Sequence, residues 1–158
     1  MRAQRRESTS PEVRLRRCLF AHGLRFRLHQ PLLHGRARKI DIVLPKHRAA
    51  VFVDGCFWHG CPQHGTRPKV NRWYWDAKFS RNQARDRDTD RRLRALGWKV
   101  FRFWEHLSPE SAAARVAKWV AVRESKRTGS ASGGARRQAS PHVNARAPHS
   151  RRKSAVAS

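Results

Sequence analysis

The apolar positions near the start of the chain recur at helical spacing and then alternate. The helical stripe consists of three residues, Leu15, Cys18 and Leu19. Its start is marked by Ser10, which can cap, and by Pro11, which suits the first helical position. Thr9 and Glu12 have capping-box spacing. Gly23 would end this helix. Over residues 24–28 apolar side chains then alternate with arginine, which predicts a half-buried strand.

The later elements follow from the same kind of pattern. They are, in order, strands at 40–44 and 50–53 joined by a turn at 45–48, a polar helix at 76–96, a strand at 98–104 and a helix from Ser108. Gly97 would cap the polar helix. Helix, three strands, helix, strand and helix is the order of an α/β fold, with a mixed sheet between helices.

The composition changes at about residue 123. Residues 124–158 are mostly Ser, Ala, Gly, Pro, Arg and Lys, and such a segment buries too little apolar surface to offset its ordering entropy. We therefore predict one domain over 1–123 and a disordered basic tail over 124–158. The tail is either a nonspecific DNA tether or a solvated extension without a role.

The charge narrows the choice of partner. With 36 basic and 11 acidic residues the chain carries a formal charge of +25, which favours a nucleic acid, with an anionic membrane as the competing partner. No apolar run is long enough to span a membrane and no signal peptide is evident, so we expect no membrane partner and a cytoplasmic location. Three cysteines are too few for a disulfide scaffold and suggest metal binding.

Cysteine and histidine are concentrated just after the second strand of the predicted hairpin. Cys56, Cys61 and His64 offer three zinc ligands within nine residues, and His106, after the 98–104 strand, is the best fourth. The alternative is two buried cysteines and two surface histidines. The spacing matches no common zinc finger.

Three other residues suggest hydrolysis. Asp41 interrupts an apolar strand, and alternation puts its side chain opposite those of Ile40 and Ile42. It is either a solvent-facing carboxylate or an oxygen ligand for Mg²⁺. His59 would lie near it and could move a proton. Asp86 could orient that imidazole, unless it belongs to a merely solvated helix face.

Aromatic and polar side chains surround these candidates. Phe57, Trp58 and Trp75 are either core residues or, among cations, side chains that stack on or wedge between bases. Asn82 shares one face of the polar helix with Asp86, and Arg85 is their neighbour, which makes both candidate DNA contacts.

Taken together, these residues resemble the very short patch repair DNA mismatch endonucleases. The matching segments are Ser10-Pro11-Glu12, Lys39 through Leu44, Val51 through His59, Asn71 through Trp75, Arg81 through Asp86, Gly97-Trp98 and Trp104-Glu105-His106. The Gly-Cys-Phe-Trp-His run is the most specific of them. The similarity extends from about Ser8 to about Val122.

The resemblance implies a restriction-endonuclease-like fold with a structural zinc ion. It also implies Mg²⁺-dependent cleavage of one DNA strand, 5′ of the mispaired thymine in a T:G mismatch left by deaminated 5-methylcytosine. The implied roles, by position, are metal binding by Asp41, catalysis by His59 paired with Asp86, support by Glu12, and intercalation by Phe57, Trp58 and Trp75. A monomer acting before other repair proteins is the expected form.

Five positions depart from the family pattern. Ile40 replaces a proline, Asp54 stands where the best-known form has histidine, Cys61 and His64 reverse the order of ligand types, and His106 replaces a cysteine. All four zinc candidates can still bind the metal. Two other functions remain open: a structure-specific or restriction-type nuclease without mismatch preference, and a non-enzymatic, zinc-stabilised nucleic-acid-binding module.

Overall fold

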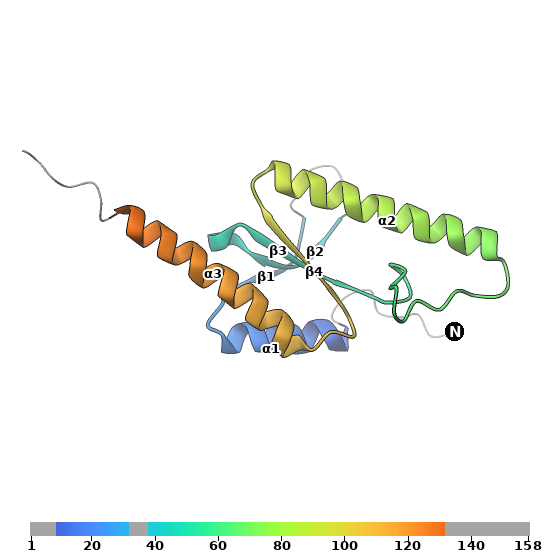
Figure 1. Ribbon diagram of the computed structural model, residues 1–158, viewed down its shortest axis with the longest axis horizontal. Coiled ribbons are helices and arrows are strands. Elements are labelled where there is room, and N and C mark those ends of the chain that lie inside the picture. The colour runs from blue at the N-terminus through green and yellow to red at the C-terminus, as the bar shows by residue number, and fades with distance from the viewer. Residues whose placement is uncertain (1–8, 32–37, 132–158) are drawn as a thin grey trace, which may run out of the picture.

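A computed structural model of the chain describes residues 9–31 and 38–131 (Figure 1). Its elements are α1 (Ser10–Ala21), β1 (Arg27–Gln30), β2 (Ile40–Leu44), the 3-10 turn η1 (Pro45–His47), β3 (Ala49–Asp54), α2 (Arg72–Ala95), β4 (Lys99–Trp104) and α3 (Pro109–Ala131). The predicted order of helices and strands is therefore present, and the fold is mixed α/β.

The four strands form one sheet in the order β1-β2-β3-β4. β1 and β2 pair antiparallel, β2 and β3 form the predicted hairpin, and β3 pairs parallel to β4. The parallel pair needs a crossover, which α2 supplies. In this pair Phe52 lies beside Arg102 and Asp54 beside Trp104. A loop over residues 55–71 joins β3 to α2, and it carries most of the cysteine, histidine and aromatic motif.

Two apolar clusters hold the helices to the sheet. α1 and α3 cover one face, through Leu15, Leu19, Ala113 and Val116 against Ile42, Leu44 and Val51. α2 covers the other face, through Leu93 against Ile40, Val43, Ala50, Phe52 and Val100. Figure 1 shows α2 on the opposite side of the sheet from α1 and α3. Because β3 is covered on both sides, nearly all its side chains are buried, as in a central strand.

The start of α1 differs from the predicted capping box. Thr9, and not Ser10, is the N-cap, and its side chain makes no capping hydrogen bond, so the reciprocal capping box is not complete. Glu12 is instead buried and lies 3.0 Å from Arg16 Nη2. Gly23 has a φ of +75°, the left-handed conformation expected where it ends the helix.

Two helix boundaries also differ. α2 begins at Arg72, not Asp76, so Trp73, Tyr74 and Trp75 form its first turn. α3 continues past the predicted domain boundary at Arg123 to Ala131, so the first part of the predicted tail is helical. Residues 132–158 lie outside the described residues, and their disorder stays a prediction. In the part of the chain that the structure describes, no helix is long and apolar enough to cross a membrane.

Candidate active site and metal centre

Asp41 lies where the β2–β3 hairpin stops pairing regularly. The paired register ends at Ile42, and Asp41 Oδ2 accepts the Val53 N–H at 2.9 Å. The backbone does not alternate strictly here: Ile40 packs in the α2 cluster and Ile42 in the α1–α3 cluster. The prediction that both isoleucines lie opposite Asp41 was therefore wrong. The carboxylate is half-buried where the β2–β3 pairing ends, rather than pointing from a regular strand into solvent.

His59 and Asp86 form a hydrogen-bonded pair across the site. His59 Nδ1 lies 2.6 Å from Asp86 Oδ2, and both side chains are about one-fifth exposed. A carboxylate can only accept, so Nδ1 carries the proton and Nε2 keeps its lone pair. The neutral imidazole is thereby set to accept a proton at Nε2. The helix face that bears Asp86 is a wall of the site and not a solvated surface.

Asp54 links this pair to Asp41. Its Oδ1 lies 3.7 Å from His59 Nδ1, and its charge also acts on Asp41. Arg102, from β4, reaches Asp54 at 2.6 Å, Asp86 at 3.4 Å and Asp90 at 2.9 Å. The site therefore draws on both strands of the hairpin, the loop, α2 and β4.

Burial and neighbouring charges shift the acid–base properties of these groups. Burial raises the pKa of Asp41 to about 6, the Val53 N–H opposes this, and the charges of Glu12 and Asp54 add to it. Burial also raises the pKa of Asp54, against the charge of Arg102. Two buried carboxyls that resist ionisation are a common sign of a functional site.

The paired residues shift in opposite directions. Burial lowers the pKa of His59, but the hydrogen bond with Asp86 and the charge of Asp54 outweigh it, so the net shift is upward. Burial raises the pKa of Asp86, but its bond with His59 and the charge of Arg102 leave the net value below normal. Asp86 is thus ionised and can stabilise a protonated His59.

The four predicted zinc ligands come together at one end of the 55–71 loop. The ligand atoms of Cys56, Cys61, His64 and His106 all lie within 4.8 Å of one another. His106 Nδ1 is 3.1 Å from Cys56 Sγ and 3.8 Å from Cys61 Sγ. These values bracket the roughly 3.5 Å that separates ligands around a tetrahedral zinc ion. The donor set of two thiols and two imidazoles fits a closed structural site.

The loop can follow this path because of Gly65. A Cβ at this position would collide with the Cys61 carbonyl oxygen, while the Gly65 N–H donates to the same oxygen at 2.8 Å. Glu105 supports the other cysteine, since its Oε1 accepts the Cys56 N–H at 2.6 Å. Cys56 and Cys61, two of the four candidate metal ligands, therefore lie in or beside a tight turn that any side chain at position 65 would disrupt.

Phe57, Trp58 and Trp75 form a single aromatic cluster beside the His59–Asp86 pair. The ring of Phe57 meets Trp58 at 5.1 Å and Trp75 at 5.3 Å, and it rests on the buried Phe79 at 5.6 Å. Lys78 Nζ lies 5.0 Å from the Trp58 ring. Trp58 remains 38% exposed, so core packing does not account for it.

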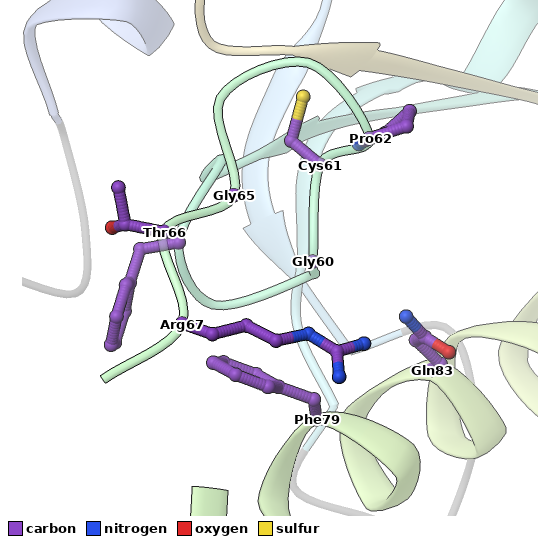
Figure 2. Close-up of a pocket in the computed structure, with 9 residues that line it drawn as sticks. Gly60, Cys61, Pro62, Gly65, Thr66, Arg67, Phe79 and Gln83 are labelled. Carbon is purple, nitrogen blue, oxygen red and sulfur yellow. The ribbon is translucent and has the colours of Figure 1, made fainter. Parts of the chain in front are cut away.

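A pocket of about 250 Å³ lies next to this cluster, between the 55–71 loop and α2. Figure 2 shows the Arg67 side chain crossing it, between the loop and the Phe79 ring, with its guanidinium toward Gln83. Phe57 also lines the pocket. The ring of Phe57 thus has packed neighbours on one side and open space on the other.

Of the other two predicted DNA contacts, Asn82 holds the loop to α2 and Arg85 bonds to Asn82 within the helix. Asn82 Nδ2 donates to the Trp58 carbonyl oxygen at 2.9 Å, and Arg85 Nη2 donates to Asn82 Oδ1 at 3.1 Å. Asn82 thus fixes an aromatic residue in place, while Arg85 remains exposed.

Two residues of this site were missed or left unassigned from the sequence. Arg102 was not singled out within the predicted 98–104 strand, and Asp54 had no assigned role. The available signal was the one that singled out Asp41, a charged residue inside an apolar strand. Glu105, next to a predicted metal ligand, is a third residue that contacts the loop.

A sheet flanked by helices, a histidine–aspartate pair and an adjacent group of four candidate metal ligands are the features expected of a metal-dependent endonuclease. A family model described as DNA mismatch endonuclease Vsr matches residues 1–64. The type II nicking enzyme V.NaeI of Lentzea aerocolonigenes is 47% identical over 118 residues, covering 73% of this chain and 71% of that protein. The type II nicking enzyme V.NmeDIP of Neisseria meningitidis serogroup C is 40% identical over 108 residues, covering 67% and 71%.

The DNA mismatch endonuclease Vsr of Escherichia coli (strain K12) is 34% identical over 128 residues, covering 76% of this chain and 80% of that protein. The chain belongs to the Vsr family of DNA endonucleases. The resemblance found in the sequence is confirmed.

Proposed function

We propose that the chain nicks one strand of double-stranded DNA on the 5′ side of the mispaired thymine in a T:G mismatch, by Mg²⁺-dependent hydrolysis. The observation that carries this proposal is the 2.6 Å His59–Asp86 contact, next in the chain to an aromatic cluster in which Trp58 is exposed. One group can activate water while the other enters the base stack. The relative named as a mismatch endonuclease supports the proposed substrate, and those named as nicking enzymes support the cut in one strand.

Recognition begins with charge and continues with stacking. The formal charge of +25 attracts DNA phosphates, so affinity should fall steeply as salt rises. Phe57, Trp58 and Trp75 then insert beside the mismatch. Unstacking costs about a few kcal/mol per step, and a weakly stacked, mispaired site lowers that cost. A T:G pair is therefore opened in preference to a matched pair.

In the chemical step, His59 Nε2 accepts a proton from water while the new oxygen–phosphorus bond forms and the bond to the leaving oxygen breaks. Asp86 holds the ring through Nδ1 and stabilises the imidazolium. Asp41 would hold Mg²⁺, which when bound supplies Lewis-acid polarisation of the phosphate. The fit is chemical: Asp41 is a half-buried carboxylate whose neighbours Glu12 and Asp54 add negative charge that a cation would relieve.

Cys56, Cys61, His64 and His106 would hold a structural zinc ion. Its contribution is to fix the loop that carries Phe57, Trp58 and His59. We propose that the protein acts as a monomer. One chain then brings one His59–Asp86 pair to the DNA, which suits a single cut in one strand.

The test is a gel assay with a strand-labelled duplex containing one T:G pair and its fully paired control, with and without Mg²⁺. We expect a Mg²⁺-dependent nick beside the thymine of the mismatched duplex alone. Cleavage of both duplexes would assign a nuclease without mismatch preference, and binding without cleavage would assign a DNA-binding module.

Variants separate chemistry from binding. His59→Ala and Asp41→Ala should abolish nicking while mobility shifts show DNA binding largely unchanged. His22→Ala removes an exposed imidazole outside the site and serves as the matched control. Loss of DNA binding in both site variants would contradict these roles.

A further inference from the structure

Arg102 makes more charged contacts within the site than its position on a strand would suggest. Its Nη1 lies 2.6 Å from Asp54 Oδ1, its Nε 2.9 Å from Asp90 Oδ1, and its Nη2 3.4 Å from Asp86 Oδ1. All three guanidinium nitrogens are therefore directed at different carboxylates. The side chain is about one-fifth exposed, so water screens these contacts only in part.

The plane of the guanidinium is fixed as well. Cζ lies 4.4 Å from the centroid of the Phe52 ring, the residue paired with Arg102 across the β3–β4 ladder. Stacking on Phe52 from one side and three carboxylates around the edge leave the group a single orientation. A guanidinium committed in this way is not free to reach a DNA phosphate.

The contact with Asp86 bears on the reaction. Asp86 uses Oδ2 for His59 and Oδ1 for Arg102, so the two partners hold both oxygens of one carboxylate. Without the cation, Asp54 and Asp86 would repel each other beside His59, and Asp86 would lose the contact that fixes its rotation. We propose that Arg102 is a positioning residue for the nicking reaction, which orients Asp86 and through it His59 without binding DNA. This inference rests on the proposed function.

The geometry requires arginine. Lysine carries the same charge but concentrates it on one nitrogen, which cannot serve three carboxylates in three directions. Arg102→Lys therefore keeps the positive charge and removes the planar guanidinium that reaches three carboxylates. Loss of a group that orients a catalytic partner typically costs about 10–100-fold in activity, and we expect a reduction of that size in the single-turnover nicking rate.

The experiment measures the single-turnover rate at saturating DNA and, separately, the dissociation constant for the T:G duplex. Arg102→Lys should lower the rate and leave the dissociation constant unchanged. Asp90→Asn removes one anchor of Arg102 without touching His59 and should lower the rate to a smaller extent. Arg94→Ala is the matched control, because Arg94 pairs with the same Asp90 but is 61% exposed.

A rescue experiment distinguishes positioning from general structural support. Millimolar guanidinium should restore part of the rate of Arg102→Ala, whereas NaCl at the same ionic strength should not. Wild-type rates in both Arg102→Lys and Asp90→Asn would overturn the inference and leave the proposed function standing. A higher dissociation constant with an unchanged rate would also overturn it, since Arg102 would then be a DNA contact.

The wild-type protein distinguishes a failure of the proposed function from a failure of the Arg102 inference. If wild-type protein cleaves mismatched and paired duplexes equally, the mismatch specificity fails, while the ratio of variant to wild-type rate still decides the role of Arg102. If wild-type protein cleaves neither duplex, the proposed function and the inference are both overturned.

Discussion

Replacing Asp41 with asparagine should make the protein more stable while abolishing nicking. The carboxylate is half-buried, and Glu12 and Asp54 add negative charge around it. Asparagine has nearly the same shape, and its side-chain oxygen can still accept the Val53 N–H now bound at 2.9 Å. The substitution therefore removes a buried charge and keeps the hydrogen bond.

The magnitude follows from the shift in pKa. Burial raises the pKa of Asp41 from 3.8 to about 6 in the folded protein. This is a shift of about two units, and at 1.36 kcal/mol per unit it amounts to about 3 kcal/mol. Between these two pKa values the folded state binds more protons than the unfolded state, so wild-type stability falls as pH rises through this window. The full penalty is present above about pH 7, where asparagine avoids it.

Urea unfolding followed by tryptophan fluorescence in Mg²⁺-free buffer measures this difference. At pH 8 the free energy of unfolding of Asp41→Asn should exceed that of wild type by about 3 kcal/mol, and the difference should shrink toward zero near pH 4. Added Mg²⁺ should stabilise the wild type and not the variant. Asp76→Asn, at an exposed carboxylate, is the control. A variant less stable than wild type at pH 8, or a difference independent of pH, would refute the reasoning.

Three further predictions concern the metal, the core and pH. Purified protein should contain one zinc ion per chain by elemental analysis, and Cys61→Ala should lose most of it and melt at a lower temperature; a metal-free wild type would remove the zinc site. Leu93→Ala, at a fully buried position on the sheet-facing side of α2, should lower the free energy of unfolding by about 2–5 kcal/mol in urea titrations, whereas Leu96→Ala, half exposed, should change it by less than about 0.5 kcal/mol. Burial lowers the pKa of His47 although Glu124 opposes it, so the unfolded state takes up the proton first and stability falls as pH drops through about 6.5. His47→Gln should show a smaller loss of stability between pH 7.5 and 5.5, and equal losses in both proteins would contradict this.

Local pattern was enough to predict most of the elements. The hairpin, the polar helix and the β4 strand each depend on periodicity and turn residues close in sequence, and the structure contains all three. The start of α2 was missed because Trp73, Tyr74 and Trp75 are weak helix formers, and Asn71 in a left-handed conformation precedes them. The extension of α3 was missed because few apolar residues mark it.

The site was predictable where residue chemistry is distinctive. Two cysteines and two histidines indicated a metal cluster, and the structure brings their ligand atoms together. The contacts of Arg102 were not predictable, because they depend on strand register. Only the parallel pairing of β3 with β4 puts it beside Phe52 and within reach of Asp54 and Asp86. The local sequence marks Arg102 only as a charged residue inside an apolar strand, and its partners are set by this non-local pairing.

The aromatic cluster and the His59–Asp86 pair are carried by the same two segments, the 55–71 loop and α2. Trp58 and His59 are consecutive residues, with Cα atoms about 3.8 Å apart. Trp75 and Asp86 stand on the same helix, eleven residues or about 16 Å apart along its axis. If DNA displaces the aromatic residues, the movement of Trp58 is therefore passed to His59 through one peptide unit. The movement of Trp75 is passed to Asp86 through helix α2. In the proposed mechanism, a shift of the aromatic side chains within the DNA stack would therefore also move His59, the general base.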